Sequence, residues 1–341
     1  MVNKIGLDLG YANITLSDMT CGVFREPAVA LIDKNSRRII SVGTKAIEES
    51  DAYLESALLV RPFKNGLLFD KQITQSIIAN ATKNLVNEDK LRLVVGIPSD
   101  LSQRQERELY EMFVNVGIKD CLFVNRSVAA LVGAGCSPKL SVISVNVGAA
   151  FTEIVVFDEG KITVTQRAPV GGEDFDKAVK QYIFDQGDVN VSGSVARDIK
   201  EKLGSVWRGK PSDSVQIEGT LAMTGNKISM TISTDDIVGV FEKPLYKLLM
   251  AVAEVVKKIP LDNVEKTFKN GIVLTGGGAM IHGMDVMMEK IIGVPVYQPS
   301  GSIDSVAKGL SLINSMMPYR GRAGGKNVTD FVAKYYQENL N

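Results

Sequence analysis

Three glycine-containing turns in this sequence could hold phosphate groups. They lie at Gly10, at Gly148 and at Gly276–Gly278, and each follows an apolar, strand-like run. A turn without side chains lets backbone N–H groups approach phosphate oxygens closely. One such turn is weak evidence, but two that repeat and a third before a helix N-terminus favour a nucleotide-binding cleft.

Histidine and cysteine chemistry is limited. The single histidine, His282, excludes a multi-histidine metal site, and any Ser-His-Asp or Cys-His catalytic set would have to use it. We interpret it as an ordinary loop or helix-start residue. The three cysteines have no C-x-x-C spacing and are odd in number, which favours a reduced environment. Chemistry must therefore rest on carboxylates, glycine turns and bound ligands.

Charge and hydropathy exclude further classes. The 341 residues include 39 Lys and Arg and 39 Asp and Glu, so the formal net charge is zero. Bulk charge would not hold such a chain to nucleic acid, and we expect no nucleic-acid partner. No run of about 18 or more apolar residues is present, and the first residues show no signal-peptide pattern. We expect a cytoplasmic protein.

The elements that must position the turns alternate between strand-like and helix-like segments, which predicts an α/β fold. Residues 5–12 resemble residues 143–150, about 138 positions later, and each segment is a strand, a glycine turn and a second strand. We expect two related domains of mixed sheet, with helices on both sides, that face each other across a cleft. The expected bounds are 1–140, with a small insertion at about 20–66, then 141–317, with a small insertion at about 180–240, and a tail at 318–341.

Several longer segments carry a family resemblance. They are Gly6–Asn13 (compare G-I-D-L-G-T-A-N), Arg61–Gly66 (R-P-L-K-D-G), Gly171–Phe175 (A-G-D-E-F), Asp198–Leu203 and Gly271–Ala279. Their order and spacing resemble the actin superfamily, and specifically the bacterial rod-shape actin homologues of the MreB/Mbl family. The resemblance runs from residue 3 to about residue 316.

The resemblance implies an actin-like fold that binds ATP or ADP with Mg²⁺. Asp8, Asn146 and Arg126 stand at the family's catalytic positions. None is expected to bind metal directly, although Asp8 could act through water. The implied nucleotide contacts are Gly10, Tyr11, Ala12, Asn13, Gly148, Ala149, Ala150, Phe151, Arg197, Lys200, Glu201, Gly276, Gly277, Gly278, Ala279 and Met280.

The second phosphate loop departs from the family pattern D-I-G-G-G-T-T. Asn146 replaces an aspartate and has no charge for a hard divalent cation. Ala149 and Ala150 place methyl groups where backbone should approach phosphate oxygens. Phe151, and Tyr11 in the first loop, replace small threonines and could fill part of the phosphate space. We therefore expect an altered cleft.

Arg126 is the second departure, because it stands where the family carries a glutamate that positions the attacking water. Arginine stays protonated and cannot act as a general base, although it could hold a γ-phosphate or replace the charge of the metal. Loss of both water-positioning groups predicts weak or lost ATP hydrolysis, since each group is commonly worth roughly 10²–10⁴-fold. The alternatives are that the alignment slips by one residue or that a neighbour such as Glu173 compensates.

The membrane attachment expected of the family also differs. The loop at 86–92 is short and charged, so the usual apolar anchor is missing there. The tail offers two alternatives, because its apolar residues fall on one helical face: a peripheral membrane contact, or a terminal helix that folds back on the body. These residues are Val328, Phe331, Val332, Tyr335 and Tyr336.

The resemblance implies a bacterial cytoskeletal subunit that serves cell shape and forms head-to-tail protofilaments with itself. MreB-like paralogues are a second expected partner in these protofilaments. The alternative is a non-polymerising actin-like adaptor that recruits partners in division or envelope assembly. Sugar kinases and Hsp70 chaperones share the fold. A sugar kinase needs larger insertions, and an Hsp70 chaperone needs a downstream substrate domain.

Overall fold

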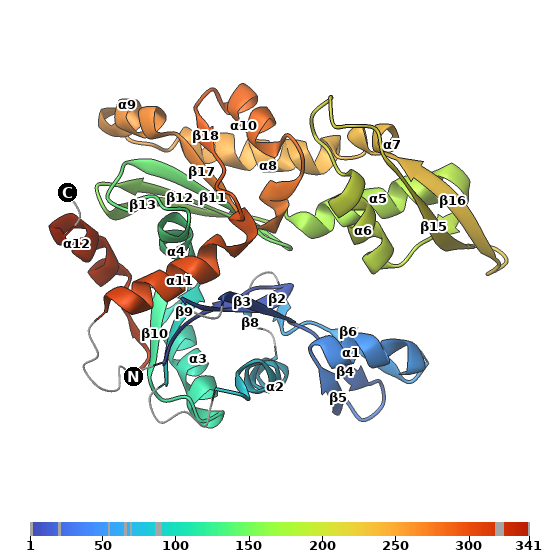
Figure 1. The fold of residues 1–341 in the computed structure, drawn as a ribbon, viewed down its shortest axis with the longest axis horizontal. Coiled ribbons are helices and arrows are strands. Elements are labelled where there is room, and N and C mark those ends of the chain that lie inside the picture. Colours follow the sequence, from blue (N-terminus) through green and yellow to red (C-terminus); the bar gives the residue numbers. More distant parts are fainter. Residues whose placement is uncertain are drawn as a thin grey trace. The chain divides into compact units, whose positions relative to one another are not determined.

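The computed structural model describes residues 3–19, 22–53, 55–64, 67–68, 70–85, 91–317 and 324–339. The chain divides into two compact units (Figure 1). Unit 1 comprises Met1–Ser141, Phe157–Thr165 and Asp304–Asn341, and unit 2 comprises Val142–Val156 and Gln166–Ile303.

A six-stranded sheet forms the centre of unit 1, in the order β19-β10-β9-β1-β2-β3. Neighbours among β1, β9, β10 and β19 are parallel, whereas β2 is antiparallel to both β1 and β3. The strands are β1 (Asn3–Leu9), β2 (Asn13–Asp18), β3 (Gly22–Pro27), β9 (Leu91–Ile97), β10 (Cys121–Asn125) and β19 (Lys326–Asn327).

Helices cover both faces of this sheet, because successive side chains of β1 point to opposite faces. Leu7 is fully buried in a core shared with α2 (Lys71–Thr82) and α3 (Gln103–Asn115). Gly6 faces α11 (Ser305–Met316), which also packs against α4 (Arg126–Gly133). This packing places the residues from Asp304 onward in unit 1, whereas the expected second domain ran to 317.

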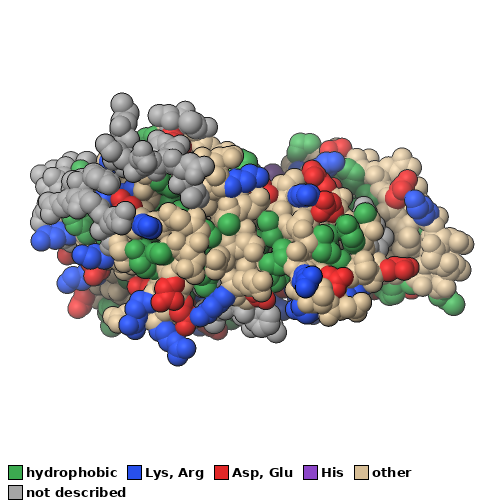
Figure 2. Space-filling model, turned by 90° about the horizontal axis from the view of Figure 1, so that it is seen from below, with side chains coloured by type: hydrophobic (Ala, Val, Ile, Leu, Met, Phe, Trp, Pro, Cys, Tyr) green, Lys and Arg blue, Asp and Glu red, His purple; other side chains and the backbone are tan. Residues whose placement is uncertain are grey.

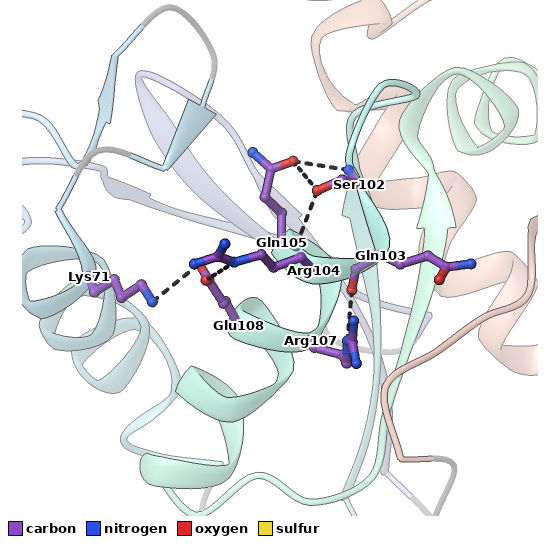
Figure 3. Close-up of polar contacts among 7 residues, drawn as sticks. All are labelled: Lys71, Ser102, Gln103, Arg104, Gln105, Arg107 and Glu108. Carbon is purple, nitrogen blue, oxygen red and sulfur yellow. Dashed lines mark hydrogen bonds and ion pairs between the residues drawn. The ribbon is translucent and has the colours of Figure 1, made fainter.

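The start of α3 shows how local sequence sets an element (Figure 3). The hydroxyl of Ser102 accepts a hydrogen bond from the N–H of Gln105 at 3.4 Å, and the N–H of Ser102 donates to Oε1 of Gln105 at 3.0 Å. This reciprocal capping box satisfies two N–H groups that the helix leaves unpaired. One turn later, Glu108 accepts from Arg104 at 3.2 Å and pairs with Lys71 of α2 at 3.2 Å, so it links the two helices.

A smaller sheet lies within the expected insertion at about 20–66. Its strands are β5 (Ile39–Val42), β4 (Ala30–Asp33) and β6 (Ala57–Val60), in that order, and α1 (Thr44–Glu49) and the 3-10 helix η1 (Ser50–Tyr53) lie beside them. Leu31 and Ala46 belong to its own buried cluster. The antiparallel pair β7 (Phe63–Lys64) and β8 (Leu67–Leu68) follows.

The five-stranded sheet of unit 2 has the order β13-β12-β11-β17-β18, although the end of β12 and the first part of β13, which lie within Phe157–Thr165, are counted in unit 1. Its central strands are fully buried at Val145 and Leu274. The strands are β11 (Val142–Val147), β12 (Thr152–Asp158), β13 (Lys161–Ala168), β17 (Ile272–Thr275) and β18 (Val296–Tyr297). The helices are α5 (Gly172–Gly187), α8 (Glu242–Val256), α9 (Leu261–Asn270) and α10 (Met284–Ile292), with the 3-10 helices η2 (Gly277–Met280) and η3 (Ser302–Asp304).

The expected insertion at about 180–240 contains a third, antiparallel sheet. It consists of β14 (Val189–Asn190), β15 (Ser214–Leu221) and β16 (Lys227–Ser233), together with α6 (Gly193–Leu203) and α7 (Thr234–Val238). The hydroxyl of Ser192 caps α6 by accepting from the N–H of Val195. Helix α6 packs against α5, so its polar residues lie close to the N-terminal half of that helix.

The tail folds back on unit 1, which is one of the two arrangements expected for it. Strand β19 extends the sheet beside β10, and the N–H of Val328 donates to the carbonyl of Phe123 at 2.8 Å. In the following α12 (Thr329–Asn339), Val332 and Tyr336 are buried while Phe331 is 45% exposed. Residues 318–323 and 340–341 of the tail, and residues 86–90 of the expected anchor loop, lie outside the described residues.

The face of the molecule drawn in Figure 2 is mixed in charge. On the face drawn in Figure 2, basic and acidic side chains are interspersed rather than gathered into a field of one sign. Such a face does not steer a polyanion from a distance. Across the described ranges, no helix combines the length and apolar character that a membrane crossing requires.

Candidate functional site

The first candidate loop joins β1 to β2 in unit 1 and contains Gly10, Tyr11, Ala12 and Asn13. Arg61 holds this loop, because its Nη1 donates to the carbonyl of Tyr11 at 3.3 Å and to that of Ala12 at 3.2 Å. The same guanidinium lies 5.3 Å from the centre of the Tyr11 ring. The ring that replaces the family's threonine is therefore stacked against an arginine.

Asp8 and Arg126 form an ion pair beside this loop. Nε of Arg126 lies 2.9 Å from Oδ1 of Asp8, and Nη2 donates to Oδ2 at 3.2 Å. The contact of Nε with Oδ1 is close but does not have the alignment of a hydrogen bond. The hydrogen bond of this pair is the one that Nη2 donates to Oδ2. The side chain of Arg126 is 10% exposed and that of Asp8 is 14% exposed, so water screens the attraction between them only weakly.

The position of Arg126 is set by its helix and by a glycine. Arg126 is the first residue of α4, and Asn125 caps that helix by accepting from the N–H groups of Ser127 at 2.8 Å and Val128 at 3.3 Å. A Cβ at Gly96 of β9 would lie 3.1 Å from Cγ of Arg126, so the absence of a side chain there leaves space for the arginine stem. A cation at a helix N-terminus opposes the helix dipole, and Asp8 offsets that cost.

The second candidate loop joins β11 to β12 in unit 2. It is closed by a bond from the N–H of Gly148 to the carbonyl of Phe151 at 3.0 Å. The N-terminus of α5 then binds its backbone, because the N–H of Gly172 donates to Gly148 at 2.9 Å and that of Glu173 donates to Ala149 at 2.8 Å. A Cβ at Gly171 would lie 2.6 Å from the carbonyl oxygen of Ala149, so this close approach requires glycine.

The second loop has an aromatic ring stacked against an arginine, as the first loop has, but it lacks an acidic residue. The Phe151 ring lies 4.7 Å from the guanidinium carbon of Arg167, as the Tyr11 ring is stacked against Arg61. Asn146 is buried, and its Oδ1 accepts from the Thr275 hydroxyl at 3.4 Å. Asn146 is the last but one residue of β11, as Asp8 is of β1, and it has no charge.

The expected nucleoside contacts lie on α6 and on the turn after β17. Nζ of Lys200 is 2.7 Å from Oδ1 of Asp176 and donates to the carbonyl of Gly172 at 3.3 Å, while Nε of Arg197 is 3.7 Å from Oδ2 of Asp176. Asp176 of α5 thus orients both cations. Glu201, the third expected contact on α6, is exposed.

The turn after β17 has the backbone conformation that its glycines allow. Gly276 has a φ of 90°, and its N–H donates to the carbonyl of Ser302 at 2.9 Å. Gly277 opens η2, Gly278 and Ala279 are buried, and Met280 is 57% exposed.

The structure gathers the expected residues into two groups, one on each unit. Unit 1 holds Asp8, residues 10–13 and Arg126 together. Unit 2 holds Asn146, residues 148–151 and residues 276–280 on adjacent strands, and the Gly172 carbonyl links Lys200 to the second loop.

Sequence reasoning missed the residues that hold these groups in place. Arg61 belongs to one of the family-like motifs, but the sequence indicates no role for it. No motif marks Asp176 or Arg167, because the residues that they contact lie on other elements. His282 is exposed, and its Nδ1 lies 2.9 Å from the Ser205 hydroxyl. Within the described ranges, no three His, Cys, Asp or Glu side chains form a metal-ligating group.

Known proteins match this chain over nearly all its length. The chain is 26% identical over 320 residues to the cell shape-determining protein Mbl of Bacillus cereus, covering 91% of this chain and 95% of that protein. It is 24% identical over 318 residues to the cell shape-determining protein MreB of Escherichia coli K12, covering 90% and 92%.

Solved structures match as well. The crystal structure of MreB5 of Spiroplasma citri bound to ADP superposes with a TM-score of 0.85 at 23% identity, covering 92% of this chain and 97% of that one. The MamK double helical filament matches with a TM-score of 0.76 at 17% identity, covering 92% and 99%. The fold is therefore actin-like. A family profile described as MreB/Mbl protein matches residues 2–319, and the chain belongs to the MreB/Mbl family.

Proposed function

We propose that this chain is an actin-like cytoskeletal subunit that binds ATP or ADP, assembles head-to-tail into filaments that serve cell shape, and hydrolyses ATP weakly or not at all. One observation carries the proposal: a MreB/Mbl match over residues 2–319 coexists with an arginine, ion-paired to Asp8, at a catalytic position. The body of the family is retained while its hydrolytic chemistry is changed.

Nucleotide binding is supported by the adenosine side. The turn at Gly276–Gly278 keeps the family's sequence, and Lys200 is oriented by Asp176 at 2.7 Å. The matching MreB5 structures are described as bound to ADP and to AMPPNP. The Mg²⁺ expected with the nucleotide stays a prediction that the loop residues do not favour.

Weak hydrolysis is supported by the two replaced carboxylates. Asn146 has no negative charge to organise water around a metal, and Arg126 cannot accept a proton from an attacking water. Glu173, the neighbour that could compensate, begins α5 and contacts the second loop through its backbone N–H. We place it in a structural role.

Filament assembly is supported by relatives that are named for cell shape and by the fold match to the MamK filament. A body with two complementary ends adds subunits head-to-tail without closing into a ring. Co-assembly with an MreB-like paralogue would allow a weakly hydrolysing subunit to slow the turnover of a mixed filament.

We place the protein in the cytoplasm. Burial of Val332 and Tyr336 makes membrane contact through the tail the less favoured assignment.

Sedimentation of the purified chain with and without ATP tests this proposal, with negative-stain microscopy of the pellet and an assay of released phosphate. We expect filaments and little phosphate release. Filaments that release phosphate rapidly would contradict weak hydrolysis. A clear supernatant in both conditions, and in the presence of a co-expressed MreB-like paralogue, would contradict the cytoskeletal role.

The second candidate function is a non-polymerising adaptor that recruits partners in division or envelope assembly. The altered second loop favours it, because Ala149 and Ala150 carry methyl groups and Phe151 is stacked against Arg167. Such a loop could hold a nucleotide as a fixed structural ligand. Nucleotide binding without sedimentation would select this function.

A further inference from the structure

A divalent cation fits poorly at the residues that match the family's phosphate loops. Mg²⁺ is held by carboxylate oxygens, phosphate oxygens and water. Of the two aspartates that the family pattern places here, Asp8 remains and Asn146 replaces the other. The Asp8 carboxylate already lies 2.9 Å from the Arg126 guanidinium, so a metal would have to share that carboxylate with a fixed positive charge.

Arg126 is fixed where it stands. Its side chain is 10% exposed, and its stem fills the space that Gly96 leaves open. To move away from Asp8 it would have to give up an ion pair with a poorly hydrated carboxylate, which is strongly unfavourable. The guanidinium is therefore a resident charge of this part of unit 1.

The charges in unit 1 alone disfavour a metal there. The family pattern places an aspartate and a glutamate at the positions of Asp8 and Arg126, and their formal charges sum to −2, which attracts a divalent cation. In this chain Asp8 and Arg126 sum to zero before any metal is added. These two residues thus offer polyphosphate a less negative environment than the two acids of the family pattern do.

The geometry of Arg126 also suits phosphate. A guanidinium has five N–H donors in a planar fork, and Asp8 engages one edge of it. Such forks bind phosphate oxygens in pairs, and the N-terminus of α4, where Arg126 stands, adds the positive end of a helix dipole.

We infer that this chain binds nucleoside polyphosphates without a divalent cation, and that Arg126 supplies the positive charge that Mg²⁺ supplies in the family pattern. The inference rests on the nucleotide binding proposed above. It assigns Arg126 a role in binding, where the family residue at that position acts on water.

Titration of the full chain with a fluorescent ATP analogue, in excess EDTA and in excess MgCl₂, tests this inference. We expect dissociation constants that agree within about threefold, because the required charge is already present. Arg126→Gln should weaken binding in EDTA by roughly 10–100-fold, the range of one charge-assisted hydrogen bond. Arg126→Lys keeps the charge without the fork and should lose less.

The double variant Asp8→Asn with Arg126→Gln keeps the test valid if Arg126→Gln alone unfolds, since it removes both charges of the ion pair together. It should show the same weakened binding in EDTA, with a native circular dichroism spectrum. Binding that disappears in EDTA and returns with Mg²⁺ would overturn the inference and leave nucleotide binding intact. Unchanged affinity in the folded double variant would overturn the role of Arg126. No binding in either condition would overturn both the inference and the nucleotide binding on which it rests.

Discussion

The two candidate phosphate loops of this protein share a backbone plan and differ in charge. Each has a strand, a glycine turn and a second strand, and in each an aromatic ring after the turn is stacked against an arginine, Tyr11 with Arg61 and Phe151 with Arg167. The loop of unit 1 keeps its acidic residue and pairs it with Arg126. In the loop of unit 2, an asparagine replaces the acid.

The difference shows that backbone geometry and chemistry change separately. In unit 2 the N-terminus of α5 binds the backbone of Gly148 and Ala149, so backbone hydrogen bonds hold the loop without a charge at position 146. In unit 1 the poorly hydrated charge of Asp8 is paired with Arg126. We therefore expect substitutions in unit 1 to act through charge and substitutions in unit 2 to act through shape.

Restoring the family's acidic residues should produce the largest change. Arg126→Glu combined with Asn146→Asp returns the two water-positioning carboxylates, and we expect phosphate release in Mg-ATP to rise by roughly 10²–10⁴-fold. The assay is phosphate release by the wild type, both single variants and the double variant, each with Mg²⁺ and with EDTA. The rise should require both substitutions and Mg²⁺. An unchanged rate would show that the loops fail for another reason, such as the aromatic rings.

Removing the polar residue from each loop should separate charge from shape. Asp8→Ala leaves Arg126 poorly hydrated and unpaired, and should cost about 2–3 kcal/mol of stability in unit 1, below the cost for a fully buried pair. Asn146→Ala removes one long hydrogen bond and should cost about 1 kcal/mol in unit 2.

The two units can be followed separately in this comparison. The single tryptophan, Trp207, reports unfolding of unit 2, and hydrogen exchange of peptides from β1, β9 and β10 reports unit 1. Equal costs in the two units would remove the distinction between a charged and an uncharged loop.

A methyl group at Gly171 should disturb the shape of the second loop. In Gly171→Ala the new Cβ meets the carbonyl oxygens of Gly148 and Ala149 at 2.7 and 2.6 Å, so the N-terminus of α5 must shift, at a cost of about 1–3 kcal/mol. Gly193→Ala, at the start of α6, is the matched control, because a Cβ there meets nothing within 4 Å. It should be neutral or slightly stabilising. The midpoint of urea unfolding followed by Trp207 fluorescence measures both, and equal midpoints would contradict the close approach at Gly171.

Much of the fold could be predicted from the sequence, because apolar strands and the glycine turns at Gly10, Gly148 and Gly276 are local signals. The actin-like fold and the MreB/Mbl family, both expected from the resemblance of longer motifs such as Gly6–Asn13 and Gly271–Ala279, are confirmed. The packing of Asp304–Asn341 into unit 1 was not predicted, because it depends on α11 meeting β1, which lies about 300 residues earlier. Strand β19 is two polar residues long and has no apolar pattern.

For the candidate site, the sequence indicates which residues stand in the three glycine turns and beside them, but it does not predict their contacts. The sequence placed Arg126 at a catalytic position and left open whether it would hold phosphate or replace the charge of a metal. Its contact with Asp8 joins residues 118 positions apart, and the contact of Lys200 with Asp176 joins two helices. Sequence spacing does not encode such contacts, since they depend on how strands and helices pack.

The exposed ion pairs of Glu108 provide the smallest effect and a reference for the buried pair at Asp8. Hydrogen bonds from Lys71 first, and then from Arg104, lower the pKa of Glu108 below its usual value of 4.5. Because the folded pKa is lowered, the stabilisation is present above the unfolded pKa and is lost as the pH falls through the folded pKa. Urea unfolding at a series of pH values from about 6 downward should therefore show that the wild type is slightly more stable than Glu108→Gln, and that this difference disappears in acid.

Glu111→Gln on the same helix is the control for removing a surface carboxylate. Added salt should shrink the Glu108 difference, because exposed charges are screened, while leaving the cost of Asp8→Ala almost unchanged. Equal salt sensitivity at the two sites would contradict the burial that we assign to the Asp8 and Arg126 pair.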